Sequence, residues 1–384
     1  MLTREDALSV DKDDPLAHWR EQFAIADQSL VYLDGNSLGM MPLRTADRIR
    51  NVLHDEWAGG LIRSWDHWVD LPQRVGDRLA PLIGAAPGEV VVHDSTTVNL
   101  FQLIDAACAL RPDRAVIAVS SGDFPTDRYV VEGIARGRGL RVSDSFDDFH
   151  DVAVMVRSVV DYRTAEVADV AGETTRAHAA GALALWDLSH AAGLLEFDLG
   201  AAGVQLAVGC TYKYLNGGPG SPAFSYVARE LQATLPQQIW GWFAQSDQFE
   251  MGPTFSPQPD IRRLLLGTPS ILALAAAEEG IAVTVEAGIA AIAAKARHLT
   301  GFGLDLCNQL GLESRTPLDA ARRGGHVAVI HPDARRLVTD LLRRGVITDY
   351  RAPDIVRIGC SPLTTRFTDV FDGLTLIASL ASLR

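Results

Sequence analysis

The chain has 384 residues, of which 47% are hydrophobic and 22% are charged, a composition typical of globular proteins. This length is too great for one small core and suits one large α/β domain with a smaller one. The 35 basic and 48 acidic residues give a formal net charge of −13, which argues against an electrostatic grip on nucleic acid or on an anionic membrane surface.

The N-terminus and the cysteine pattern predict a cytoplasmic protein. The opening stretch MLTREDALSVDKDDPLAHWR is charged and lacks the apolar core of a signal peptide. The cysteines lie far apart, in or beside apolar runs, and show no zinc-type spacing, so we expect reduced, mostly buried thiols and no metal site. They are Cys108, Cys210, Cys307 and Cys360.

In chain order, the first predicted features are an extended segment and two helical stretches. Residues 31–42 (VYLDGNSLGMMP) suit a strand that ends in a turn, and 43–57 has the period of an amphipathic helix. Residues 59–84 open with an irregular, aromatic-rich stretch and continue into a second helix that ends near Gly84.

From residue 89 onward, short apolar runs alternate with helical stretches. This alternation predicts a mostly parallel, seven-stranded type of central sheet with helices on both faces. The expected strands are 89–93, 115–120, 152–160 and 182–189, and the expected helices are 95–110, 129–139 and 164–181.

The most apolar stretch, residues 271–296, predicts one long packed helix. Glu278, Glu279 and Glu286 interrupt it, which makes it a poor membrane span. After about residue 300 the pattern changes to that of a smaller α+β domain that ends in a helix. We therefore expect an N-terminal segment (1–45) that contributes to the small domain and the active site, a large domain (46–295) and a small C-terminal domain (296–384).

Candidate ligand-binding residues follow the apolar runs, because ligands of such sheets bind outside the carboxyl ends of the strands. Thr96 and Thr97 stand at a predicted helix start, where free N–H groups and hydroxyls suit a phosphate, although a simple helix cap is an equal alternative. Phe124 lies in a loop, where it can stack on a planar ligand or merely pack the loop. Asp187 ends an apolar strand with His190 three residues on, and a carboxylate there needs a cation or a strong donor, although a simple capping aspartate is the alternative.

A lysine in the stretch GCTYKYLNGGPGSPAF completes this set. Lys213, with Tyr212 before it, follows the apolar run VQLAV, and the alternative is an ordinary surface lysine. A phosphate cradle, an aromatic face, an acid, an imidazole and an amine together match pyridoxal phosphate, which forms a Schiff base with lysine and needs a carboxylate at its ring nitrogen. The glycines after Lys213 form no Walker loop, since no GK[ST] follows.

The chain resembles the kynureninases, a family of fold-type-I pyridoxal-phosphate enzymes related to the class V aminotransferases. The similarity runs from about residue 32 to about residue 367, and its most specific parts are WDLSHAAG and TYKYLNGGPG. The other matching stretches are YLDGNSLG, GLIRSW, TTVNL, FPTD, GWF, LLGTPSIL, RGGHV and DIVRIGCSPLTTRF.

The resemblance implies a role for each matching residue. Lys213 would attach the cofactor, Asp187 would pair with its ring nitrogen, and Tyr212 would donate or relay a proton. Arg357 would bind the substrate α-carboxylate. The cofactor would further contact Thr96, Thr97, Phe124, Asp127, Ser158, His190, Trp242 and, from the partner subunit of a homodimer, Thr268, while Trp65, Ser37 and Asn36 would border the substrate ring.

The implied reaction is hydrolytic cleavage of L-kynurenine, and possible cleavage of its 3-hydroxy form, to the anthranilate and L-alanine in tryptophan degradation. Two departures from the family, Ala244 with Gln245 and the loop MGPTFSPQPDIRR, leave substrate preference open. The alternatives are another fold-type-I enzyme, such as a cysteine desulfurase or selenocysteine lyase, and a non-catalytic cofactor-binding relative. A nicotinamide dehydrogenase lacks support, because no GxGxxG follows the first strand.

Overall fold

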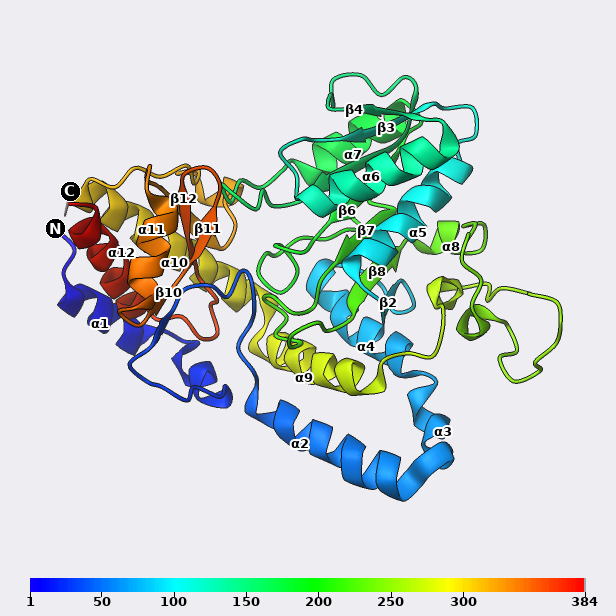
Figure 1. Cartoon of the computed structure of the whole chain (residues 1–384), viewed down its shortest axis with the longest axis horizontal. Helices are drawn as coiled ribbons and strands as arrows, with labels where there is room; N and C mark the ends of the chain where they lie inside the picture. Colours follow the sequence, from blue (N-terminus) through cyan, green and yellow to red (C-terminus); the bar gives the residue numbers. More distant parts are fainter. Residues whose placement is uncertain (383–384) are drawn as a thin grey trace.

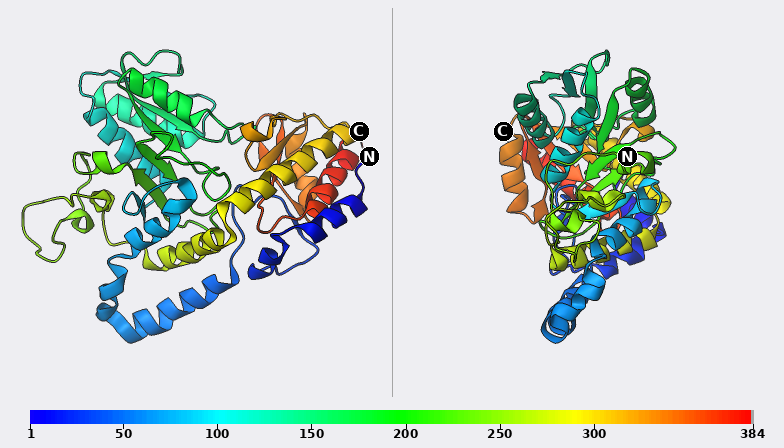
Figure 2. Two further views of the ribbon diagram at one scale, coloured as in Figure 1. Left: turned by 180° about the vertical axis from the view of Figure 1, so that it is seen from behind. Right: turned by 90° about the vertical axis from the view of Figure 1, so that its right-hand side faces the viewer.

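The structure, a computed structural model, describes residues 1–382 and consists of a large and a small body (Figures 1 and 2). The large body surrounds a seven-stranded sheet, and the small one surrounds a three-stranded sheet. Both chain termini lie on the small body, where the first and last helices pack together (Figure 1).

The large sheet has the strand order β2-β8-β7-β6-β5-β3-β4. In this order, adjacent strands from β7 to β4 run parallel to each other, whereas β8 runs antiparallel to both of its neighbours, β2 and β7. The prediction of a mostly parallel α/β sheet is therefore confirmed. The strands are β2 (Val90–His93), β3 (Val116–Val119), β4 (Arg141–Ser143), β5 (Val152–Ser158), β6 (Leu183–Asp187), β7 (Leu206–Gly209) and β8 (Ala223–Val227).

Helices cover both faces of this sheet, which explains why its strands are unbroken apolar runs. Along β2, Val90 and Val92 pack into one hydrophobic cluster while Val91 packs into the other, as the two-residue period of a strand requires. One cluster includes α4 (Leu71–Leu79), α7 (Val170–Ala179) and α9 (Ile271–Ala287), and the other includes α5 (Thr96–Ala109) and α6 (Pro125–Arg138).

Several predicted boundaries are wrong. The helix expected over 271–296 is broken at Gly288, whose φ of +82° no α-helix can continue, so α9 is followed by a separate α10 (Ile289–Leu310). The helix expected over 43–57 is α-helical only in α2 (Leu43–Asn51) and then widens into a π-helical segment (Val52–Gly60). Strands β4 and β8 were not predicted.

Between this segment and α4 lie a short 3-10 turn and α3 (Trp65–Trp68). A 3-10 turn (Ala80–Ile83) follows α4, and it ends at Gly84 in a left-handed conformation, as the sequence predicts. A short α8 (Arg229–Gln232) follows β8.

The small body has a sheet ordered β11-β12-β9, in which all neighbours are antiparallel. Its strands are β9 (His326–Ile330), β11 (Asp349–Arg351) and β12 (Ile355–Gly359), and its helices include α11 (Ala334–Leu342) and α12 (Phe367–Ala381). The N-terminal segment joins this body through α1 (Arg4–Asp13), which packs on α12, and through β1 (Val31–Tyr32), which pairs with β10 (Val346–Ile347). The domain division remains a prediction, and its boundary at residues 295 and 296 falls inside α10.

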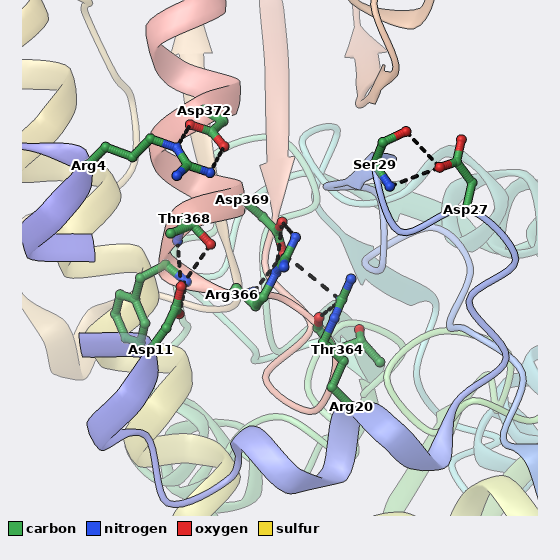
Figure 3. A network of polar contacts seen from close by, with 11 residues as sticks. Arg4, Asp11, Arg20, Asp27, Ser29, Thr364, Arg366, Thr368, Asp369 and Asp372 are labelled. Atoms are coloured by element: carbon green, nitrogen blue, oxygen red, sulfur yellow. Dashed lines mark hydrogen bonds and ion pairs between the residues drawn. The ribbon is translucent and has the colours of Figure 1, made fainter. Parts of the chain in front are cut away.

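Polar contacts attach α1 to the start of α12 (Figure 3). The Asp11 carboxylate accepts hydrogen bonds from the Phe367 and Thr368 amides at 2.6 and 3.1 Å and from the Thr368 hydroxyl at 2.8 Å. Arg4 binds Asp372 through two hydrogen bonds, of 2.8 and 2.9 Å. Asp11 thus supplies acceptors for first-turn amides that have no partner within their own helix.

Within residues 1–382, no helix combines the length and the apolar character that crossing a membrane demands.

Replacing Asp11 by alanine is expected to lower the free energy of unfolding by about 1–2 kcal/mol, because the first turn of α12 loses its capping carboxylate. Urea unfolding measures this change. The control is Asp13→Ala at an exposed position of the same helix; equal losses in the two variants would contradict the capping role.

Candidate active site

The candidate active site is a cavity at the carboxyl ends of β5, β6 and β7, called the central cavity below. Nine of the fifteen predicted site residues line it, on the first turns of α5 and α6 and on the loops after the strands. Its lining residues are Thr96, Thr97, Phe124, Thr126, Asp127, Ser158, Val160, Tyr162, Asp187, Ser189, His190, Tyr212 and Lys213.

Lys213 is buried, with 9% of its surface exposed, so the interpretation of it as a surface lysine is wrong. Its Nζ lies 3.0 Å from His190 Nε2, and the Phe124 and Tyr212 ring centres lie 5.8 and 5.9 Å away. Burial lowers the pKa of His190 well below its usual range, and the charge of Lys213 lowers it further. This shift favours the neutral imidazole, whose Nε2 can accept a hydrogen bond from the amine.

Two buried carboxyl groups face this amine. Asp187 ends β6 and accepts a hydrogen bond from the Ser189 amide at 2.8 Å, while Asp127 accepts one from the Ser158 hydroxyl at 3.3 Å. Burial raises the pKa of both groups, and the charge of Asp187 raises that of Asp127 further. Asp127 Oδ1 is buried without a partner among residues 1–382. A cationic ring nitrogen between these groups would supply the missing charge, so the residues fit a pyridinium cofactor.

The phosphate end of such a cofactor has a matching element. Ser95 caps α5 by accepting a hydrogen bond from the Val98 amide at 3.4 Å. Thr96 and Thr97 are the first two residues of the helix, where amides lack intrahelical acceptors and the helix dipole favours an anion. Both threonines line the same cavity.

Arg357 lies beside the central cavity, in β12, and is completely buried. It donates to both carboxylate oxygens of Asp349, the Nε bond measuring 2.7 Å, and to the Tyr162 carbonyl at 2.7 Å. Ser37 accepts a further bond at 3.0 Å, and the Asn36 amide oxygen lies within 3.2 Å when it faces the guanidinium. Since Tyr162 also lines the central cavity, this cluster adjoins the cavity directly.

Asp349 is the partner that holds this guanidinium in place. Although burial raises the pKa of Asp349, the hydrogen bonds and charge of Arg357 hold it below its usual value. The nearby Asp34 behaves differently, because burial and the charge of Asp349 raise its pKa to about 6.

Three predicted residues lie apart from the central cavity of this chain. Trp65 and Trp242 contact each other, with ring centres 6.3 Å apart, and both pack against Phe243. Thr268 is exposed in the turn before α9. The cofactor and substrate roles of these three residues stay predictions.

Sequence reasoning missed four lining residues: Thr126, Val160, Tyr162 and Ser189. Thr126 and Ser189 stand inside the FPTD and WDLS motifs, so the motifs contained the signal. Tyr162 and Asp349 reach the site only through tertiary folding, and only the proximity of Asp349 to Arg357 in the sequence hinted at their pairing.

The four cysteines are buried and unpaired, as expected. Burial raises the pKa of Cys360 to about 12 and also raises that of Cys210. A reactive thiolate, which a cysteine desulfurase needs, is therefore disfavoured at each of these positions.

The turn GNSLG of the N-terminal segment packs directly on the lysine loop. Gly39 donates a hydrogen bond from its amide to the Tyr212 carbonyl at 2.8 Å. A Cβ at Gly39 would lie 2.3 Å from the Lys213 carbonyl oxygen and 2.9 Å from Asn216 Cα. Only glycine allows this close approach of two backbones.

Replacing Gly39 by alanine is therefore expected to displace the lysine loop and to destabilise the protein by about 1–3 kcal/mol. Thermal unfolding measures the loss. Gly133→Ala in α6 is the control, because a Cβ there meets no atom within 4 Å and alanine favours a helix. A Gly39→Ala protein as stable as Gly133→Ala would disprove the close packing.

Comparison with known proteins agrees with this geometry. The model of the kynureninase C-terminal domain matches residues 292–377. Kynureninases from Pseudomonas fluorescens and from Burkholderia pseudomallei strain K96243 are each 43% identical over 399 aligned residues, which cover 99% of this chain and 96% of each relative.

Solved structures show the same fold at low sequence identity. The apo cysteine desulfurase of Thermococcus onnurineus NA1 superposes with a TM-score of 0.80 at 16% identity, over 97% of this chain and 98% of that one. A C-DES mutant with glycine covalently linked to its PLP cofactor gives 0.81 at 16% identity, over 94% and 98%. Because the similarity to curated relatives extends over almost the entire chain, the protein belongs to the kynureninase family.

Proposed function

We propose that the protein hydrolyses the Cβ–Cγ bond of L-kynurenine, and of its 3-hydroxy form, with pyridoxal 5′-phosphate as cofactor. The observation that supports this proposal most directly is the buried Lys213 amine, which shares one cavity with the carboxyl groups of Asp187 and Asp127. The curated relatives named kynureninase support the same reaction.

The chain's own residues would hold each part of the cofactor. Lys213 would be the attachment point, Phe124 would stack on the ring, and Asp187 would pair with the ring nitrogen, with Asp127 nearby. Thr96, Thr97 and Tyr212 would hold the phosphate, while Ser158 and His190 would line the pocket. Trp242 is proposed as a further phosphate contact on the family resemblance alone, since it lies apart from the central cavity of its own chain. When bound, the cofactor withdraws electrons from the substrate's α-carbon.

In the proposed reaction, one water adds across the bond that breaks. Its oxygen enters the carboxylate of anthranilate, and Cβ gains a proton to become the methyl group of L-alanine. The Lys213 amine would move the α-proton, and the Tyr212 phenol would donate or relay a proton. Burial raises the pKa of Tyr212, which keeps the phenol protonated at neutral pH.

Arg357 is the proposed ligand of the substrate α-carboxylate. Asp349 orients its guanidinium, and Ser37 and Asn36 lie against the same group. Trp65 would border the aromatic ring of the substrate. We further propose a place in cytoplasmic tryptophan degradation, which can supply NAD biosynthesis.

A homodimer is the proposed assembly, with Thr268 completing the phosphate site of the partner subunit. The dimer is supported by large apolar side chains that a monomer would expose to water. Ile62 is 75% exposed, Leu61 is 60% exposed and Trp57 is 57% exposed. A groove formed by Val52, Trp57, Trp68 and the start of α9 (Ile271–Ala287) adjoins them. Exposed apolar residues also gather on segment 237–258, which reaches outward from the large body (Figure 1): Ile239, Trp240, Phe249 and Met251.

An absorbance spectrum with pyridoxal phosphate, followed by addition of L-kynurenine, tests the reaction. The expected result is a visible cofactor band and anthranilate fluorescence in the wild type, and neither in Lys213→Ala. Lys12→Ala, at an exposed lysine, is the matched control and should behave as wild type. Turnover by Lys213→Ala at the wild-type rate would refute the assignment.

Replacing Ile62 by aspartate is expected to shift the protein from dimer to monomer, because a charge would have to lose its water in the interface. Light scattering reads the mass directly, 41.4 kDa per chain. Leu318→Asp, at a residue 83% exposed in the small body, is the control. A monomeric wild type, or an Ile62→Asp variant that remains dimeric, would count against this interface.

A further inference from the structure

A third carboxyl group, that of Asp123, lies close enough to Asp127 and Asp187 for their charges to act on one another. It precedes α6 in the loop after β3, and its Oδ1 accepts a hydrogen bond from the Ser158 amide at 3.3 Å. Its Oδ2 is buried and has no hydrogen-bond partner among the described residues 1–382. The proposed reaction assigns no task to this group.

Asp123 lines a second cavity, called the side cavity below, of about 700 Å³. Ser158 lines both cavities: its amide contacts Asp123, and its hydroxyl contacts Asp127. At the rim, Arg322 and Glu166 form an ion pair with side chains that are 61% and 48% exposed, so solvent reaches the side cavity. Its other charged lining residues are Arg157, Asp161, Asp169 and Glu173.

The charges that face Asp123 are mostly negative. Asp187 on β6 and Asp127 on α6 repel its ionised form, whereas Arg157 on β5 attracts it. Arg157 is itself bound to Glu173 at 2.7 Å, which reduces its effect on Asp123. Burial raises the pKa of Asp123 to about 7, and Asp187 adds to this shift.

We propose that Asp123 is a positioning residue for the cofactor: its ionised carboxyl group joins those of Asp127 and Asp187 to hold the cationic ring, and it exchanges its proton with solvent through the side cavity. This inference rests on the proposed cofactor. It makes retention of the cofactor depend on the charge of a residue outside the central cavity.

The sign of the effect on the cofactor-free protein follows from linkage. In the folded protein Asp123 has a pKa of about 7, above the value of about 3.9 for an unfolded chain. The stability that this group contributes is fully present below pH 3.9 and is lost as the pH rises through 7. In Asp123→Asn this loss of stability with rising pH is absent, because the amide does not ionise.

The first measurement is the thermal unfolding of the cofactor-free wild type and of Asp123→Asn between pH 5 and pH 8. The melting temperature of the variant minus that of the wild type is expected to increase by about 2–4 °C as the pH rises over this range. A difference that does not change with pH would overturn the proposed buried acid, whether or not the protein is a kynureninase.

The second measurement is the dissociation constant of pyridoxal phosphate for the same two proteins. The variant is expected to bind about tenfold more weakly than the wild type at pH 8 and within about twofold of it at pH 5.5, where the wild-type group is also neutral. Any pH dependence of cofactor binding that the two proteins share disappears when the dissociation constant of the variant is divided by that of the wild type. A ratio that stays constant with pH would refute the role in holding the cofactor.

Glu166→Gln is the matched control, because it removes a carboxylate from the rim of the same cavity without touching the central cavity. It should change neither the pH dependence of unfolding nor the cofactor affinity. If Asp123→Asn does not fold, Asp123→Ser removes the same charge and takes its place. A wild type that binds no pyridoxal phosphate would refute the proposed function, while the unfolding experiment would still decide the protonation of Asp123.

Discussion

The cost of placing ionisable groups in a dry interior governs the architecture around the central cavity. Lys213, Asp187 and His190 are buried at or just after the ends of adjacent strands, and Asp127 is buried beside them in the first turn of α6. Burial alone would neutralise the acids and the imidazole. The large sheet can hold them there because both of its faces are covered by helices, which fixes the strand ends. The arrangement is electrostatically incomplete by itself, and a cationic ring with an anionic tail would complete it.

The same constraint applies to the candidate active site as a whole, which draws residues from both bodies. The large sheet supplies the amine and the acids, whereas the guanidinium of Arg357 comes from the small sheet and is neutralised there by Asp349. The N-terminal segment connects the two, since it pairs with the small body through β1 and then contacts the lysine loop through Gly39. Residues far apart in the sequence therefore set the position of Lys213 together.

The sequence was sufficient to predict what lies at strand ends. Nine predicted residues, from Thr96 to Lys213, line one cavity, because a parallel sheet brings its carboxyl ends to one edge. Local patterns could not reveal the break at Gly288, where a helical composition continues across a single left-handed residue. Nor could they place Asp349 or Asp123, because neither an ion pair between neighbouring strands nor a carboxyl group in a side cavity leaves a periodic pattern in the sequence. Trp65, Trp242 and Thr268 lie outside the cavity of one chain, and family resemblance is the basis for including them.

The pairing of Arg357 with Asp349 has a consequence for selectivity. A free buried guanidinium would attract any small anion that diffused into the site, including the phosphate and sulfate that cells contain. Arg357 already donates two hydrogen bonds to the Asp349 carboxylate of its own sheet. An incoming anion therefore binds only to the donors that remain, and its affinity is lower than it would be for a free guanidinium. If Arg357 binds the substrate carboxylate as proposed, discrimination would depend on a ligand that is held elsewhere in the cavity at the same time, so an amino acid would be retained where an inorganic ion is released.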